Sequence, residues 1–437
     1  MPTCDLIISA DYLLPIAPAN EVLRHHSVAI NGEIITAIGP TPDIEQVWQA
    51  SRHLKLDNHI VLPGLVNAHG HAAMTLLRGA GEDQMLQDWL QKSMWPLEGK
   101  VMGNEYVALG TELAVAEMLL SGTTTFSDMY FMPEAAAEVV NQTGMRAQLA
   151  FPIIEFPNAW SESSEDAMHK GLALFQHYRH HSLINIALGP HSGYMLSDDD
   201  LVKVTMYADE IEAQVQIHMH ENQAEVDEGV EKHGVSWIEH LQNLNALGPH
   251  LQMVHMTTLD ERDLELTIGS GASVIHCPSS NQKLASGVCP VETLRNAGVR
   301  VGLGTDGAAS NNTLDMFKEA HVAALLAKVT SLNAEHANAR DTLYMATLGS
   351  ASAMGLDTQI GSLEPGKAAD LIAVNAAHPS LQPVIDPYAT LIHGNCGHAV
   401  NHVFVNGKQL VDNGMLTQMD MGGLLSRVQA WQQDNLT

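Results

Sequence analysis

Eight short apolar segments, separated by polar and helical stretches, restrict the fold of this 437-residue chain more than any other feature. Their order predicts an α/β protein, because a repeated strand–helix alternation is typical of a parallel sheet. Eight such units favour a closed (β/α)8 TIM barrel. An open doubly wound sheet is the alternative, but no glycine-rich phosphate fingerprint follows the first segment. The segments are residues 59–71, 122–129, 146–154, 184–193, 214–222, 251–257, 272–281 and 299–307.

Two β-rich regions lie at the chain ends. The stretch "SVAINGEIITAIG" in residues 1–60 and the stretch "HVFVNGKQLV" in residues 360–437 each contain Asn-Gly, a strong signal for a hairpin turn. We expect both ends to form one small β-sandwich domain, with residues 61–359 as the catalytic barrel. Residues 421–433 are expected to form an amphipathic helix of the small domain.

The composition excludes several classes of partner. Acidic residues outnumber basic ones by 50 to 21, and the formal net charge is -29. A surface of this sign repels nucleic acid and anionic membranes, so neither is expected as a partner. The four cysteines are scattered without a CxxC pair, which fits free thiols in a reducing compartment. The N-terminus lacks a signal-peptide pattern and no apolar run reaches the length of a membrane span, so we expect a cytoplasmic enzyme.

Histidines and carboxylates gather where the predicted strands end. In a barrel these ends meet at one mouth, so residues distant in sequence become neighbours. A single histidine there is commonly a hydrogen-bonded core residue, but chance does not readily place five of them on one rim. Imidazoles with a carboxylate and an open position suit a catalytic divalent metal. The residues are His69, His71, His191, His218, Glu221, His255 and Asp306.

Four motifs carry a resemblance to a known family: "PGLVNAHGH" at 63–71, "HMHEN" at 218–222, "MVHM" at 253–256 and "LGTDGAASNN" at 303–312. With the later "GSLEPGKAADLIAV", they resemble the amidohydrolase superfamily. More narrowly, the chain is similar to the 5-methylthioadenosine/S-adenosylhomocysteine deaminases and their chlorohydrolase-like relatives over nearly its whole length. The resemblance implies hydrolytic deamination of a small-molecule nucleoside. It also implies one divalent metal ion, with Zn2+ expected and Fe2+ or Mn2+ as alternatives.

The resemblance assigns roles to individual residues. Glu221 would be the proton shuttle, His255 would orient the attacking hydroxide, and Asp306 would also take a proton from the water. His220 faces the other way in an extended strand and is expected to be structural. The segment "ALGPHSGY" offers His191 where binuclear members place a lysine, which favours a single ion. The implied metal ligands are His69, His71, His218 and Asp306.

For the substrate, the resemblance implies that Glu98 accepts hydrogen bonds from the ribose hydroxyls and that His191 and Glu221 contact the substrate. Members that hold the homocysteine carboxylate place an arginine near the end of strand three, where this chain reads "LAFPIIEFPN". Arg146 stands at the start of that strand, so it does not inherit this role. A neutral 5′-thioether is therefore expected ahead of S-adenosylhomocysteine.

Three alternatives stay open at this point. The enzyme could deaminate guanine, another aminopurine or a pterin, or it could act on triazines, although relatives that displace chloride tend to lack the shuttle carboxylate. A barrel that holds a metal only for binding is a third reading, against which Glu221 and Asp306 argue. The oligomeric state is open, and a homo-oligomer is compatible with the sequence.

Overall fold

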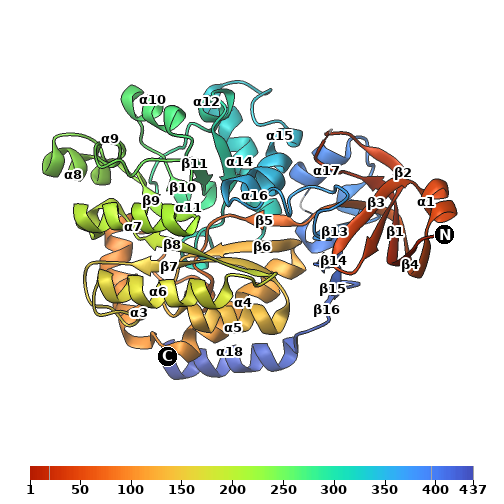
Figure 1. Cartoon of the computed structure of the whole chain (residues 1–437), viewed down its shortest axis with the longest axis horizontal. Coiled ribbons are helices and arrows are strands. Elements are labelled where there is room, and N and C mark those ends of the chain that lie inside the picture. The colour runs from red at the N-terminus through yellow and green to blue at the C-terminus, as the bar shows by residue number, and fades with distance from the viewer. Residues whose placement is uncertain (19, 395, 437) are drawn as a thin grey trace.

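The computed structural model describes residues 1–18, 20–394 and 396–436. In these residues two eight-stranded sheets organise the chain. One sheet forms a barrel surrounded by helices, and the other gathers strands from both chain ends beside it (Figure 1). The predicted (β/α)8 barrel with a separate β unit from the chain ends is confirmed.

The barrel strands are parallel and follow one another in chain order. The two outer strands of this order are joined where the backbone N–H of Ala68 donates to the carbonyl of Leu303, at 2.9 Å, which closes the barrel. The strands are β5 (Leu65–Asn67), β6 (Thr123–Asp128), β7 (Arg146–Ile153), β8 (Ile184–Pro190), β9 (Val215–Met219), β10 (Leu251–His255), β11 (Ser273–His276) and β12 (Arg300–Leu303).

Helices cover the outside of the barrel because its strands are buried on both faces. The longer helices that follow barrel strands are α4 (Asn104–Leu120), α5 (Pro133–Thr143), α6 (Ser164–Tyr178), α7 (Asp198–Ile211), α8 (Gln223–His233), α10 (Glu261–Ser270) and α14 (Met316–Ser331). Shorter ones are α9 (Trp237–Asn243), α11 (Pro278–Lys283), α12 (Val291–Asn296), α13 (Ala308–Asn311), α15 (Ala339–Tyr344), α16 (Ser350–Ala353) and α17 (Pro387–His393).

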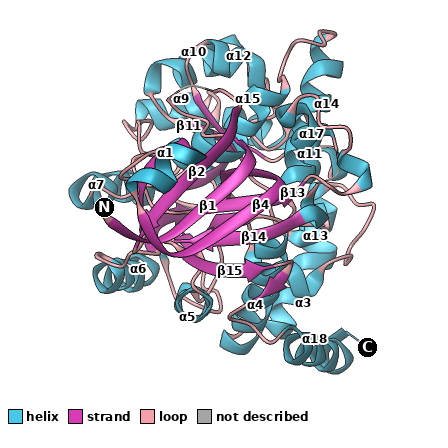
Figure 2. Ribbon diagram, turned by 90° about the vertical axis from the view of Figure 1, so that its right-hand side faces the viewer, coloured by secondary structure: helices cyan, strands magenta, loops and turns pink. Residues whose placement is uncertain are grey.

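The second sheet is mixed and continuous, in the order β16-β15-β14-β13-β4-β1-β2-β3. Figure 2 shows β2, β1, β4, β13, β14 and β15 side by side. The two predicted Asn-Gly hairpins are present, and their tips meet: a Cβ on Gly407 would collide with the carbonyl oxygen of Gly32. The strands are β1 (Thr3–Leu13), β2 (Leu23–Asn31), β3 (Ile34–Pro40), β4 (Gln49–Pro63), β13 (Leu371–Asn375), β14 (Val400–Val405), β15 (Lys408–Asp412) and β16 (Met415–Leu416), with the short α1 (Thr41–Val47) between β3 and β4.

The two sheets are joined at Gly64. The apolar segment expected to be one barrel strand is divided there: β4 ends at Pro63 in the chain-end sheet, and β5 begins the barrel at Leu65. A Cβ on Gly64 would overlap the side chain of Thr124, so the backbone can pass this close to β6 only without a side chain. Gly64 also donates to the carbonyl of Asp370 beside β13, at 3.1 Å.

The predicted C-terminal helix is α18 (Met421–Leu436). The sequence grouped it with the small β domain, but it lies along α4 of the barrel (Figure 1). Arg427 donates to Glu112 of α4 at 2.6 Å, and the ring of Trp431 lies 5.7 Å from the ring of Tyr106. The apolar side of the helix is thus covered by the barrel. The domain boundaries proposed from the sequence stay a prediction.

Arg146, at the start of β7, joins the barrel to the chain-end sheet. Its side chain is 1% exposed and donates to both carboxylate oxygens of Asp370, at 2.8 and 3.1 Å. It also donates to Asn406 and to the carbonyl of Ser182. A buried arginine with its donors satisfied in this way is a structural cross-link.

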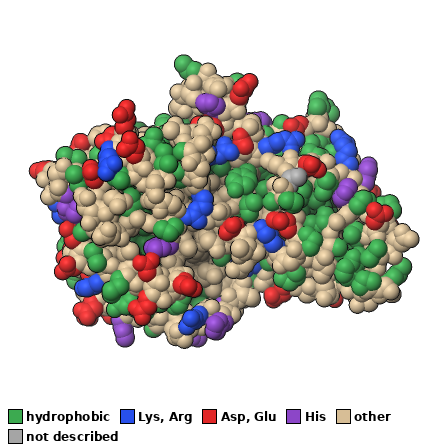
Figure 3. All heavy atoms as spheres, turned by 45° about the horizontal axis from the view of Figure 1, so that its top comes forward, with side chains coloured by type: hydrophobic (Ala, Val, Ile, Leu, Met, Phe, Trp, Pro, Cys, Tyr) green, Lys and Arg blue, Asp and Glu red, His purple; other side chains and the backbone are tan. Residues whose placement is uncertain are grey.

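The surface fits the charge expected from the sequence. In Figure 3, acidic side chains are scattered over the visible face, and lysines and arginines appear among them without forming a basic patch. Within the described residues, no helix combines the length and the apolar character needed to cross a membrane.

Candidate active site

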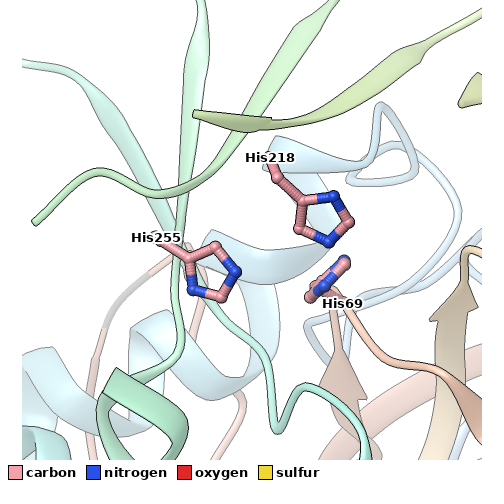
Figure 4. Close-up of side chains that lie close together, drawn as sticks. All are labelled: His69, His218 and His255. Atoms are coloured by element: carbon pink, nitrogen blue, oxygen red, sulfur yellow. The ribbon is translucent and has the colours of Figure 1, made fainter. Parts of the chain in front are cut away.

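The structure brings the four predicted metal ligands together at the barrel mouth. His69 and His71 follow β5, His218 lies in β9, and Asp306 follows β12. The Nε2 atoms of His69 and His71 lie 3.4 and 3.2 Å from the same atom, Oδ1 of Asp306. The rings of His69 and His218 have centroids 4.9 Å apart. Figure 4 shows the rings of His69, His218 and His255 converging on one point from three segments.

Each of the four rings has its Nδ1 bonded to an oxygen that can only accept. His69 donates to Oε1 of Gln216 at 2.8 Å and His71 to the carbonyl of Met129 at 2.7 Å. His218 donates to the carbonyl of His191 at 2.7 Å, and His255 to Oδ1 of Asn281 at 2.9 Å. With one proton on Nδ1, each ring in its neutral form presents the lone pair of Nε2 to a ligand. Such partners orient metal-binding histidines in many proteins.

Burial keeps most of these imidazoles neutral. It lowers the pKa of His69 and of His255 and holds that of His218 well below its usual value. For His71 burial acts in the same direction, but the hydrogen bond and charge of Asp306 outweigh it and raise the pKa to about 9. A cation in the site would take the place of that proton.

Asp306 is held as an anion. Burial alone would raise its pKa, but the neighbouring His69 and His71 side chains keep it well below the usual range. Its second oxygen accepts from Ser280 at 2.6 Å and from Ser310 at 2.8 Å. The residue has a left-handed backbone with φ 58°, a strained conformation for aspartate that often marks functional positions.

These donors fit a divalent ion. The ligand atoms of His69, His71 and Asp306 lie within 4.8 Å of one another, and so do those of His69, His218 and His255. Nε2 of His69 is buried without a hydrogen-bond partner. A buried polar atom without a partner is costly, and a metal ion would satisfy it. Three imidazoles and a carboxylate are a ligand set suited to zinc.

Glu221 lies beside this cluster, just past the end of β9. Its Oε2 is 3.7 Å from Nε2 of His255, and both side chains line the same cavity as Asp306. Burial and the negative charge of Asp306 raise the pKa of Glu221 to about 8. The backbone N–H of Glu221 donates to the buried carboxylate of Glu225 at 2.7 Å, which fixes the start of α8. The raised pKa favours the protonated form of Glu221, which lies in the same cavity as the Asp306 carboxylate.

The cavity above the cluster has a volume of about 800 Å³, within the range of small-molecule sites. Glu98 lines it from α3 (Trp95–Val101), which continues α2 (Leu86–Asp88) through a π-helical turn at 89–94. Glu98 accepts a hydrogen bond from Tyr130. Burial raises the pKa of Glu98, and the hydrogen bond from Tyr130 opposes that effect. The segment between β5 and α4 thus covers the barrel mouth and carries Glu98 into the cavity.

His191 and His220 lie on different sides of the site. His191 lines the cavity with its ring 4.7 Å from that of His218, and its Nδ1 is buried without a partner. The Nδ1 of His220 donates to the carbonyl of Thr258 at 2.9 Å and lies 3.7 Å from Asp263, away from the cluster. His220 follows the end of β9 with a left-handed backbone, φ 50°, so the expectation that it lies in an extended strand is wrong. The roles assigned to the site residues stay predictions.

Sequence reasoning missed the polar layer inside the barrel. Gln216 donates to Gln252 at 2.7 Å, and Gln252 donates to Gln148 at 3.0 Å, directly below His69. Asp128 accepts from the backbone of Ala72 at 2.6 Å and fixes the turn after His71. The available signal was a glutamine at an inward position of each of three apolar strands.

The model of the amidohydrolase family matches residues 60–410, and the chain belongs to this family. The predicted superfamily is thus confirmed. Its relatives include the 5-methylthioadenosine/S-adenosylhomocysteine deaminase of Saccharophagus degradans, 45% identical over 98% of this chain and 96% of the relative. The enzyme of that name from Teredinibacter turnerae is 44% identical over 99% and 98%. An adenosine deaminase structure from Xanthomonas campestris with bound zinc superposes with a TM-score of 0.98 at 40% identity, covering 99% of both chains.

Proposed function

We propose that the chain is a metal-dependent hydrolase that deaminates adenine nucleosides, with 5′-methylthioadenosine as the preferred substrate. One observation carries the proposal: the carboxyl groups of Asp306 and Glu221 line the same cavity beside the histidine cluster. Hydrolytic removal of an amino group needs both a base for the water and an acid for the ring, and two carboxyl groups with separated pKa values supply them. The names and the full-length similarity of the relatives support the same reaction.

In this reaction water adds to the ring carbon that bears the amino group, and ammonia leaves, so that adenine becomes hypoxanthine. Asp306 accepts the proton of the attacking water and returns it to the departing amino group, which leaves as ammonia. Glu221 gives its proton to the neighbouring ring nitrogen. His255, held by Asn281 and 3.7 Å from Glu221, orients the water with its Nε2.

The expected ion is a single zinc, with iron or manganese as alternatives. It would be held by His69, His71, His218 and Asp306. When bound there, a divalent ion lowers the pKa of water toward neutrality.

The cavity lining supports a neutral 5′ substituent. Among the described residues it contains no lysine or arginine, and its charged side chains other than histidines are carboxylates. Arg146 is committed to Asp370 on the other side of the barrel. The homocysteine carboxylate would therefore meet negative charge without a cationic partner, whereas a methylthio group would meet Met195 and Phe156. Glu98 would accept from the ribose hydroxyls, and His191 would contact the base.

An ammonia-release screen over 5′-methylthioadenosine, S-adenosylhomocysteine, adenosine, adenine and guanine tests the proposal. We expect the highest kcat/KM for 5′-methylthioadenosine and a clear preference for nucleosides over free bases. Higher activity with guanine would favour the aminopurine alternative, and a triazine in the same screen addresses the chlorohydrolase-like alternative. If zinc-loaded protein released no ammonia from any of these compounds, the result would contradict the proposal.

The proposal includes a cytoplasmic location. The four described cysteines are buried and unpaired, which supports it.

A further inference from the structure

A second group of metal-binding side chains lies outside the active site, where three helices meet. Asp198 is the first residue of α7, His233 the last of α8, and His240 lies in α9. One ligand atom from each of these residues lies within 4.8 Å of the other two. Two imidazoles and a carboxylate are a set of donors that binds transition metals.

The geometry of the group is well defined. Nε2 of His240 lies 2.8 Å from Oδ1 of Asp198, and the rings of His233 and His240 stack with centroids 3.6 Å apart and an angle of 24° between their planes. Two stacked imidazoles cannot both be cationic without strong repulsion, so at least one ring is neutral and keeps one unprotonated nitrogen. Nε2 of His233 is buried and has no hydrogen-bond partner. That atom is the independent sign that something is missing from the cluster.

The surrounding residues hold the two rings in place. Trp237 is fully buried and lies edge-on to both, with centroids 4.8 Å from His233 and 5.8 Å from His240. A Cβ on Gly193 or Gly229 would come within 3 Å of the Trp237 ring, so the ring is held between the turn at 193–195 and α8. Lys232 is the nearby cation, and its ammonium lies over Trp237, 5.3 Å from the ring. The side chain of Asp198 is 49% exposed, which leaves a path from solvent.

We propose that Asp198, His233 and His240 form a peripheral binding site for a divalent transition-metal ion of the zinc or nickel class. An ion there connects the first turn of α7 to the last turn of α8 and to α9. Because α8 begins right after Glu221 and places Glu225 and Glu228 on the cavity, the ion stabilises one wall of the active site from outside. The site is more exposed than the central cluster, so its ion exchanges faster and turnover does not require it.

The test uses the full chain loaded with one zinc per molecule and Ni2+ as the probe. Equilibrium dialysis against Ni2+, followed by elemental analysis, should show one nickel bound while the central zinc stays at one. His233→Ala removes a ligand and should raise the Ni2+ concentration for half-saturation by at least about tenfold. Asp198→Asn should weaken nickel binding too. Because it alters only an exposed carboxylate, it provides a second test if His233→Ala disturbs the packing. His169→Ala, an exposed histidine on α6, is the matched control and should bind nickel like the parent.

Retention of zinc, circular dichroism and turnover establish that each variant is folded. A parent protein that binds no nickel beyond the central site would overturn the proposal. Equal loss in His169→Ala and His233→Ala, or full binding by both His233→Ala and Asp198→Asn, would overturn it as well. The result does not depend on the substrate, so it is independent of the proposed deaminase activity.

Discussion

Tyr130 donates its phenolic hydrogen to the carboxylate of Glu98, which ties the segment over the barrel mouth to the end of β6. The hydrogen bond stabilises the ionised form of a carboxyl group whose pKa burial otherwise raises. Tyr106 lies behind this pair, with its hydroxyl 3.3 Å from that of Tyr130, and the ring of Trp431 in α18 packs on Tyr106. The ionisation of Glu98, a proposed substrate contact, therefore depends on Tyr130, which follows β6.

Tyr130→Phe is expected to move the acid limb of kcat/KM for 5′-methylthioadenosine to higher pH. The hydrogen bond lowers the pKa of Glu98, so its loss raises that pKa, and at a given acidic pH less of Glu98 is ionised. Rate measurements across pH for parent and variant check this. Tyr106→Phe, which does not contact Glu98, is the control. If the acid limb is unchanged in Tyr130→Phe, ionisation of Glu98 does not cause the pH dependence of kcat/KM.

Glu98→Ala is expected to lower kcat/KM for 5′-methylthioadenosine by about tenfold to several hundredfold. Charge-assisted hydrogen bonds to the ribose hydroxyls contribute roughly 1.5–3 kcal/mol each, and about 1.4 kcal/mol corresponds to one factor of ten. The comparison is with 2′-deoxy substrates, which should be poor for the parent and no worse for the variant. Equal discrimination between ribose and deoxyribose by both proteins would mean that Glu98 does not read the sugar.

Glu221→Gln should keep its metal and its fold but lose at least about a hundredfold in turnover, as is usual for general acid–base residues. Since the pKa of Glu221 is about 8, the parent should also lose activity as the pH rises above 8, where the acid form disappears. Single-turnover rates and metal analysis check both points. Glu228→Gln, an exposed glutamate on the same cavity, should behave nearly like the parent. Normal turnover by Glu221→Gln would assign the proton transfer to another group.

The purified protein should retain about one transition-metal ion per chain after dialysis. Removal by a chelator should abolish turnover and lower the free energy of unfolding, by about 4 kcal/mol relative to protein with free zinc at a thousandfold excess over its Kd. Elemental analysis and chemical unfolding measure these effects, and re-addition of zinc should reverse them. Two ions that are both required for turnover would contradict the mononuclear site.

Arg146→Ala should destabilise the protein by about 3–5 kcal/mol, because it leaves Asp370 buried without its partner. Arg427→Ala removes the exposed pair with Glu112 and should cost less than about 1 kcal/mol. Denaturant unfolding of both variants gives the comparison. Similar losses in the two would mean that Arg146 does not cross-link the sheets.

The clustering of the proposed ligands could be expected because each of them stands at or near the end of an apolar strand, and the barrel fold itself brings those ends together. The division between β4 and β5 was not predictable, because residues 60–66 read as one apolar run and both halves are buried. Only tertiary packing against Thr124 makes Gly64 a boundary. In the same way, the sequence places α18 directly after the strands of the chain-end sheet. Its packing partner α4 lies some 300 positions away, so this contact was not predictable.

The supporting residues escaped for a different reason. A glutamine within an apolar strand has no pattern that separates a barrel interior from a strand edge, so the layer of Gln148, Gln216 and Gln252 emerged only in three dimensions. Asn281 and Ser280 belong to α11, and their contacts with His255 and Asp306 depend on how that short helix begins. Sequence motifs thus identify the reactive side chains more easily than they identify the residues that position those side chains.

The absence of a side chain at Gly64 determines where two of the proposed metal ligands can stand. Even one methyl group there would push β5 away from β6, and the displacement would pass through five residues to His69 and seven to His71. At the same point the chain leaves one sheet and enters the other, so neither sheet can shift without carrying the ligands with it. We therefore expect Gly64→Ala to weaken zinc binding although it changes none of the residues proposed to contact the ion.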